Sequence, residues 1–138
     1  MIDSPPPPVT TQEVRIVDAQ GHPRIVLSAK DGAPTVVLMD IDGKPRATMA
    51  LDASNRPSVA LTNPDPALPS AALAIDDKGA HVKFDHPGGA SSYLFLNNQG
   101  VSGVVLIDRA GKRRLNATVA ADGTPKIERL DAGGAPLP

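Results

Sequence analysis

The stretch TVVLMDIDGKPRATMAL, residues 35–51, contains the unit from which most of the chain is built. An apolar run leads into a D-x-x-G turn, and a second stretch of alternating character follows it. Asp40 supplies the side-chain acceptor that a type I turn favours, and Gly43 supplies the left-handed backbone after it. Pro45 then stands where a strand begins and an N–H can be spared. The stretch therefore predicts a β-hairpin.

The same unit recurs along the chain, because Gly21, Gly32 and Gly43 stand 11 residues apart and later turn residues return at spacings of 10 to 12. The Pro-rich segment 63–70 is the main interruption and is predicted to be a longer surface loop. We expect eleven short strands, at about residues 14–18, 24–29, 35–40, 46–51, 58–62, 71–76, 81–85, 92–97, 103–108, 113–119 and 126–131. The pattern predicts an all-β fold of consecutive antiparallel hairpins, with about 11 residues per strand-turn unit.

Alternation within the predicted strands gives the sheet one apolar face, which we expect to be the core. It carries Ile25, Leu27, Ala29, Val36, Leu38, Ala47, Met49, Leu51, Val59, Leu61, Leu73, Ile75, Val82, Phe84, Leu115, Ala117 and Val119. In 24–29, 35–39, 93–96 and 103–107 apolar residues run continuously, which predicts a covering on the second face as well. Such a sheet must close on itself, fold back or be completed by partners. We expect completion as an intertwined or packed homotrimer, with a self-closed monomer as the alternative.

The composition limits the partners. A chain of 138 residues fits one domain, and its formal charge of -1 does not favour nucleic acid. No apolar stretch approaches the roughly 18 residues of a membrane-spanning helix, so no transmembrane segment is expected. We expect a Pro-rich tether at residues 1–13, a single domain at 14–131 and a flexible tail at 132–138. Because such a lead often follows a removed signal or anchor, we expect a secreted, periplasmic or cell-envelope protein.

The densest cluster of titratable groups lies at residues 81–86. His81 and Asp85 fall on one strand face and His86 follows, so imidazole and carboxylate could act as general acid or base. The alternative is a solvated strand face that ends in a turn. Glu128 is a further catalytic candidate, or else a surface partner of a neighbouring cation. Two histidines without a third ligand give little support for a zinc site, and we expect no cofactor.

The best wall for a planar organic ligand is formed by Tyr93 and Phe95, which point to the same side of their strand. Their alternative role is to anchor a second packed surface. Asp40 and Asp42 have the spacing of the first two ligands of a calcium-binding loop. The later ligands of such a loop are missing, so a plain hairpin turn is expected there.

The recurring D-x-x-G-x-P/R pattern, as at residues 17–24 and 39–46, resembles a group of exported bacterial β-repeat proteins over about residues 14–131. In size, β content and export the chain is also similar to trimeric, cofactor-free enzymes that demethylate the phenazine pyocyanin. The first resemblance implies an architecture rather than an activity. Because the repeats provide a rigid body and the Pro-rich lead a tether, we expect a rigid envelope or spike-like assembly, or a binding module. The second implies a tautomerising demethylase acting on a small redox-active aromatic compound in clefts between subunits.

Overall fold

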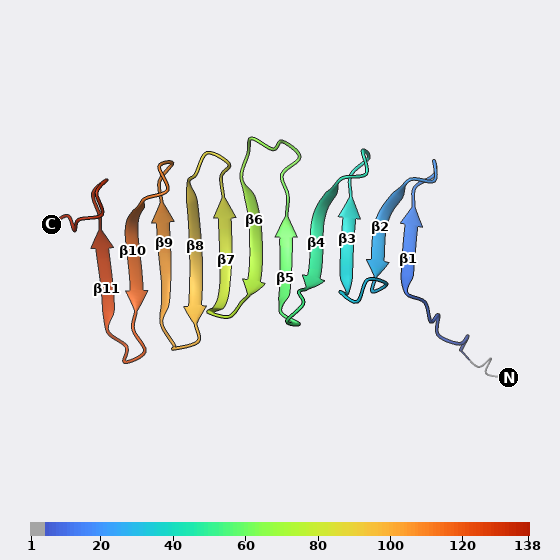
Figure 1. Cartoon of the computed structure of the whole chain (residues 1–138), viewed down its shortest axis with the longest axis horizontal. Helices are drawn as coiled ribbons and strands as arrows, with labels where there is room; N and C mark the ends of the chain where they lie inside the picture. Colours follow the sequence, from blue (N-terminus) through green and yellow to red (C-terminus); the bar gives the residue numbers. More distant parts are fainter. Residues whose placement is uncertain (1–4) are drawn as a thin grey trace.

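The computed structural model describes residues 5–138, so the first four residues of the predicted tether lie outside it. The described chain forms one antiparallel sheet of eleven strands, each paired with its neighbour in sequence (Figure 1). The strands are β1 Glu13–Val17, β2 Pro23–Ser28, β3 Thr35–Met39, β4 Pro45–Leu51, β5 Pro57–Leu61, β6 Ser70–Ile75, β7 Gly79–Asp85, β8 Ser91–Asn97, β9 Ser102–Ile107, β10 Arg113–Val119 and β11 Pro125–Arg129. The prediction of an all-β fold of consecutive hairpins is confirmed. Within residues 5–138, no helix has the length and apolar character to cross a membrane.

The hairpin turns have the predicted chemistry. The Oδ1 atom of Asp40 accepts hydrogen bonds from the amides of Asp42, at 3.0 Å, and Lys44, at 2.9 Å. Gly43 follows with φ 74°, a left-handed conformation that a residue with a Cβ rarely adopts. Among the described residues Asn55 is the one non-glycine with positive φ, and it occupies the equivalent turn position. Each turn returns the chain beside the strand it has just left, which keeps the whole chain in one plane.

The strand register collects the apolar side chains into continuous rows across the sheet. The central row pairs directly opposite residues from β1 to β11, namely Val14, Leu27, Val36, Met49, Val59, Leu73, Val82, Leu94, Val104, Ala117 and Ile127. The predicted apolar face is therefore present, and we call it the apolar face below. The opposite side of the sheet, which carries Arg15, Thr48 and Glu128, is called the polar face.

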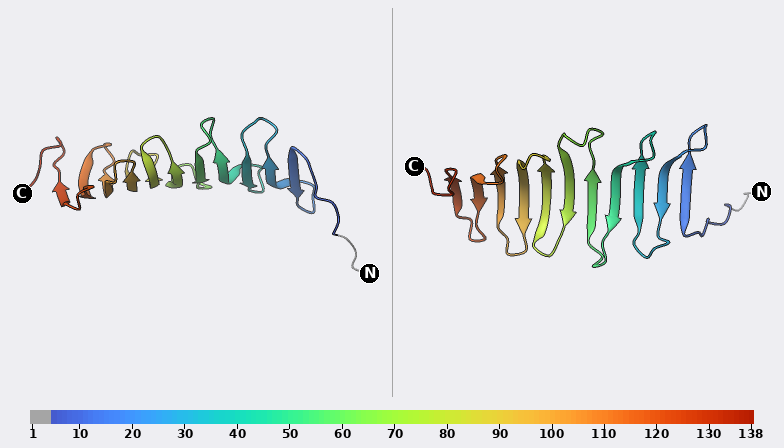
Figure 2. Two further views of the ribbon diagram at one scale, coloured as in Figure 1. Left: turned by 90° about the horizontal axis from the view of Figure 1, so that it is seen from below. Right: turned by 45° about the horizontal axis from the view of Figure 1, so that its top comes forward.

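No second layer of the chain covers the apolar face. Figure 2 shows a single layer seen from below, and Val105, at 2% exposure, is the one hydrophobic residue of the described chain that is buried. The face that we expected to be a core thus carries exposed side chains: Val14, Ile16, Leu27, Val36, Leu38, Met49, Leu61, Leu73, Ile75, Phe84, Leu94, Leu96, Val104, Leu106, Val119 and Ile127. The physical reason is that the sheet stays open, because β1 and β11 are its edges and do not pair with each other as they would in a barrel that encloses its own apolar face.

The strands with apolar residues on both faces also lack a covering layer within the chain. On the polar face Val26 and Val37 are half-buried, and Val105 is buried between Tyr93 and Asn116, its direct neighbours in the register. Neighbouring side chains on the same face therefore shield these residues. The expected second packed surface is absent from the single chain.

The two edges of the sheet are β1 and β11. Beyond β11 the chain makes one further turn, in which Asp131 accepts from the amides of Gly133 and Ala135. The amide of Leu137 then donates to the carbonyl of Arg129 at 2.8 Å, and Leu130 pairs with Pro136. The residues predicted to form the tail thus pair with the end of β11. At the other end Pro5–Pro8 are exposed and form no strand.

Candidate ligand-binding hollow

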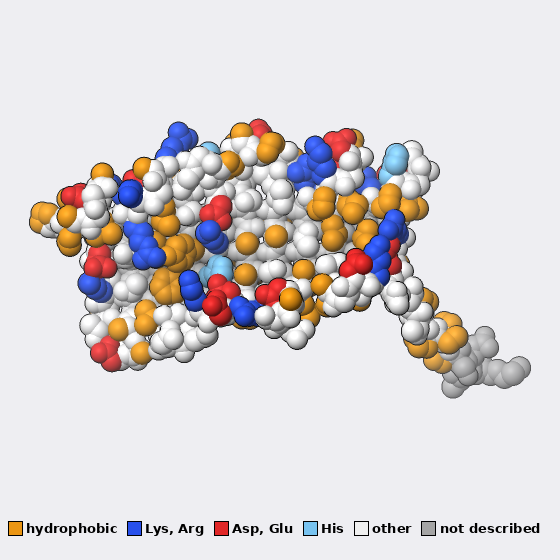
Figure 3. Space-filling model, viewed as in Figure 1, with side chains coloured by type: hydrophobic (Ala, Val, Ile, Leu, Met, Phe, Trp, Pro, Cys, Tyr) orange, Lys and Arg blue, Asp and Glu red, His pale blue; other side chains and the backbone are white. Residues whose placement is uncertain are grey.

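A hollow of about 600 Å³ lies on the polar face over β7–β11. Two rows of directly paired residues cross it. One row runs Lys83, Tyr93, Val105, Asn116, Glu128 and the other runs His81, Phe95, Gly103, Thr118, and all of these except Gly103 line the hollow. On this face, shown in Figure 3, apolar side chains gather over β8 and β9 beside charged groups and a histidine. The hollow therefore combines an apolar floor with ionisable side chains.

The aromatic wall of the hollow is the pair Tyr93 and Phe95 on β8. Their ring centroids lie 5.8 Å apart and the rings are tilted by 47°. Gly103 makes room for this pair, since a Cβ there would stand 3.0 Å from Cε1 of Phe95. The chain has one Tyr, two Phe and no Trp, and the remaining Phe84 lies on the apolar face. Two of the three aromatic side chains thus meet in this one place.

The hollow also contains a cation without a carboxylate partner. The Nη2 atom of Arg113 donates to the hydroxyl of Tyr93 at 3.0 Å. Among the residues that the structure describes, no carboxylate oxygen lies within 4.0 Å of this guanidinium. Lys83, by contrast, pairs with Asp85 at 3.0 Å. Lys78 also lines the hollow and has no ion pair among the described residues, but Arg113 is the cation that contacts the aromatic wall, so it is the group best placed to receive an anion on a ring stacked there.

The acceptors of the hollow are Asn116 and Glu128. The Nδ2 atom of Asn116 donates to Oε2 of Glu128 at 3.5 Å, while Oδ1 of Asn116 is buried with no hydrogen-bond partner in the described structure. Lys126, 2.7 Å from Glu128, lowers the pKa of that carboxyl group, and Asn116 lowers it further. Glu128 is consequently ionised at neutral pH, which makes it an acceptor rather than a proton donor.

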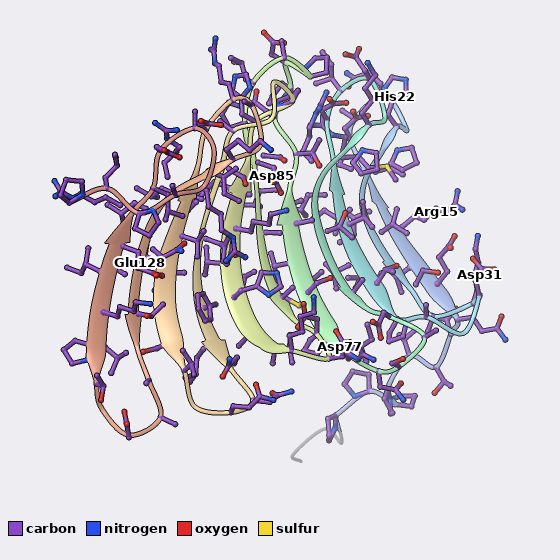
Figure 4. All side chains as sticks on the ribbon, turned by 60° about the vertical axis from the view of Figure 1, so that its left-hand side comes forward. Arg15, His22, Asp31, Asp77, Asp85 and Glu128 are labelled. Atoms are coloured by element: carbon purple, nitrogen blue, oxygen red, sulfur yellow. The ribbon has the colours of Figure 1, made fainter. Side chains whose placement is uncertain are left out.

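The six site residues predicted from sequence divide into two groups. His81, Tyr93, Phe95 and Glu128 line the hollow, and Nδ1 of His81 lies 3.8 Å from Asp76. Figure 4 labels Asp85, at the end of β7, and Glu128, on β11 at the far side of the intervening strands.

Asp85 and His86 are not among the residues that line the hollow. Asp85 forms the ion pair with Lys83, and Nδ1 of His86 accepts from the amide of Gly88 at 2.8 Å within a hairpin turn. His86 thus takes the place that Asp holds in the other turns. The catalytic roles of His81, Asp85, His86 and Glu128 stay predictions.

Sequence reasoning did not select Arg113 or Asn116. The signal that could have found them is the register: counting pairs outward from Tyr93 across three strands brings Val105, Asn116 and Glu128 into one row. Within residues 5–138, no three His, Asp or Glu side chains gather as they would around a metal ion. Asp40 and Asp42 belong to a hairpin turn, as expected.

A scan against protein-family models gave no match for this chain, and a search of curated proteins gave none either.

Proposed function

We propose that this protein is a structural β-repeat module that assembles as a homotrimer through its apolar face, forming a rigid body of the envelope or spike-like kind. The observation that carries the proposal is the central apolar row, which crosses all eleven strands without a polar residue and has nothing packed on it. Monomeric soluble proteins rarely expose contiguous apolar patches above a few hundred Å². A face of this extent indicates an obligate partner.

The central row has the character of a packed interior. From β1 to β9 valine alternates with a longer side chain, in the order Val14, Leu27, Val36, Met49, Val59, Leu73, Val82, Leu94, Val104. Alternation of small and large residues lets facing layers interdigitate. Long side chains would fill alternate levels of an interior, and the valines between them would leave the space that the long ones need. In a threefold arrangement the three copies place the same residue at each level, so levels of three long side chains would alternate with levels of three valines.

The dimensions of the sheet fit a threefold arrangement. Strands of 5 to 7 residues span roughly 17–23 Å at about 3.3 Å per residue. Three such sheets as sides of a triangular prism would each stand about 5–7 Å from the axis, close to half the ~10 Å spacing of packed sheets. The axes of the antiparallel strands also stay nearly aligned from β1 to β11 in Figure 1, so the sheet has little twist in this view. Flat sheets of many strands are usually stabilised by stacking.

The energy gained by covering the face is large on the scale of protein stability. Each exposed side chain of the face is roughly half accessible, with Leu73 at 52% and Leu94 at 58%. Covering the remaining half contributes about 1 kcal/mol per side chain. Over the whole face this amounts to on the order of 15 kcal/mol per chain, as large as the usual free energy of unfolding of a domain. The single layer, in which Val105 is the one buried hydrophobic residue among residues 5–138, lacks this contribution.

The experiment is a mass measurement in solution by size exclusion with light scattering, over a range of protein concentrations. The proposal expects three times the 14.2 kDa of one chain. A folded protein with the mass of one chain would refute assembly, and a stable two-chain mass would replace the prism by a two-sheet sandwich. Export of the protein, suggested by the Pro-rich lead, is part of the proposal and is tested by locating the native protein in cell fractions.

A further inference from the structure

We propose that the hollow on the polar face binds a planar aromatic carboxylate that carries a hydroxyl or amine group. The hollow lies on the opposite side of the sheet from the apolar face, so this inference goes beyond the assembly proposed above. It remains accessible whether or not three chains pack together. The ligand class follows from three features of the lining: an aromatic wall, a guanidinium without a carboxylate partner among the described residues, and an ionised carboxylate that can accept a hydrogen bond.

The aromatic wall selects a planar apolar body. Tyr93 and Phe95 are tilted against each other and stand over a floor that includes Val105. A flat ring system can stack on such a wall, because aromatic pairs favour offset or edge-to-face contacts at centroid distances of about 4.5–7 Å. The volume of about 600 Å³ lies in the range of small-molecule sites and accommodates two fused rings with substituents.

The guanidinium selects an anion on that ring. Arg113 donates one hydrogen bond to the Tyr93 hydroxyl, 3.0 Å away, and its other N–H groups have no carboxylate partner in the described structure. A guanidinium presents its donors in a planar fork that matches a carboxylate. A carboxylate on the ligand would therefore pair with Arg113 while the ring stacks on Tyr93.

The carboxylate of Glu128 selects a donor on the ligand. Glu128 lines the hollow, is partly exposed and is ionised, and its Oε2 atom accepts from Nδ2 of Asn116 at 3.5 Å. A carboxylate has several acceptor sites and can take a further hydrogen bond. A hydroxyl or amine on the ring would donate to Glu128, so a ligand with an acid at one end and a donor at the other fits the hollow best.

The test is isothermal titration calorimetry with 6-hydroxy-2-naphthoate, compared with two probes that each lack one group. 2-Naphthol lacks only the carboxylate, and 2-naphthoate lacks only the hydroxyl. We expect one site per chain, affinity for 2-naphthol weaker by about tenfold or more, and affinity for 2-naphthoate weaker by about threefold. Arg113→Gln should weaken binding of the hydroxynaphthoate to the level of 2-naphthol. Arg109→Gln, which removes an exposed cation from the turn after β9, is the control and should change affinity less than twofold.

Absence of saturable binding up to millimolar concentrations would overturn the proposal. So would equal affinities for the hydroxynaphthoate and 2-naphthol, or equal weakening by the two arginine substitutions. Equal affinity for 2-naphthoate would overturn the contact assigned to Glu128. The mass of each sample is measured in parallel, so a failure of the trimer is seen separately from a failure of binding. Since the ligand comparison needs no variant, the outcome does not depend on the folding of a mutant.

Discussion

Leu73→Glu should dissociate the assembly, while Ala72→Glu, one residue earlier on β6, should leave it intact. The two residues face opposite sides of the sheet. Leu73 lies in the central apolar row between Val59 and Val82, whereas Ala72 lies on the polar face directly opposite Lys83. The same substitution thus places a carboxylate in the proposed interior or beside a lysine in solvent.

The size of the effect follows from the exposure of Leu73. This side chain is 52% exposed in the single chain, so losing the burial of that half costs about 1 kcal/mol. Burying a carboxylate costs several kcal/mol more, even after relaxation. A trimer contains three copies of the change, so the total is on the order of 10 kcal/mol per assembly. Since about 1.4 kcal/mol corresponds to a factor of ten, a trimer that is stable at nanomolar concentration would separate at micromolar concentration.

The assay is the mass of both variants by light scattering, with circular dichroism to record β content. The reasoning is refuted if Leu73→Glu keeps the mass and thermal stability of the parent protein. A chain that works as a single layer would give that result, because Leu73→Glu would then only exchange an exposed apolar side chain for a solvated one. Dissociation by Ala72→Glu with retention by Leu73→Glu would place the interface on the polar face instead.

Three further outcomes are expected. Because the chain has no cysteine, Val59→Cys on the apolar face should give chains cross-linked by a short bismaleimide reagent, while Ala60→Cys on the polar face should not, as read on a denaturing gel. The hydrogen bond from the backbone amide of Lys44 is the main cause that lowers the pKa of Asp40 below its usual 3.8. The ionised carboxylate therefore stabilises the folded state above pH 3.8, and this stabilisation is lost as the pH falls through the lowered pKa. Melting temperatures measured between pH 6 and pH 2 should show this loss of stability. The loss should be smaller in Asp40→Asn, and an unchanged acid transition in that variant would contradict a stabilising role for the Asp40 carboxylate. Gly79→Ala should lower the melting temperature more than Gly43→Ala, because a Cβ at Gly79 would overlap the Leu96 carbonyl oxygen and one at Gly43 meets nothing within 4 Å. Equal losses would mean that only the positive φ values matter.

The strands could be predicted from sequence because their signals are local. A D-x-x-G turn such as Asp40–Gly43 fixes the hairpin with its own hydrogen bonds, and alternation fixes which side chains share a face. The same local signal also explains the position of His86. His-x-x-Gly at residues 86–89 occupies the position of a D-x-x-G turn, and Nδ1 of His86 accepts from Gly88 as an Asp oxygen would.

The hollow could be predicted only in part, because it depends on register summed over five strands. His81 and Glu128 lie on β7 and β11, and the pairing between β9 and β10 shifts in register between Arg113 and Leu115. A shift of this kind decides which side chain of a strand lies in a given row, and the turn residues near the strand end do not predict where the shift occurs. Tyr93, Phe95 and Glu128 were found through their residue types, while Arg113 and Asn116 had no distinguishing pattern of their own.

The burial of the apolar face could not be decided from alternation at all, since a period of two is the same whether the covering layer belongs to the same chain or to another. The strand pairing decides this point. In the described chain β1 and β11 are the edges of the sheet and do not pair with each other, so the sheet stays open instead of closing over its apolar face as a barrel of consecutive hairpins does. In the assembly proposed above, other copies of the chain cover the apolar row that is continuous from Val14 to Ile127. In a threefold assembly all three apolar faces would point to the axis, and the three hollows would open outward on the polar faces, each with its own Arg113 and Tyr93. Assembly and ligand binding would thus occupy opposite sides of one sheet, so a substitution such as Leu73→Glu should abolish the first without removing any group that lines the second.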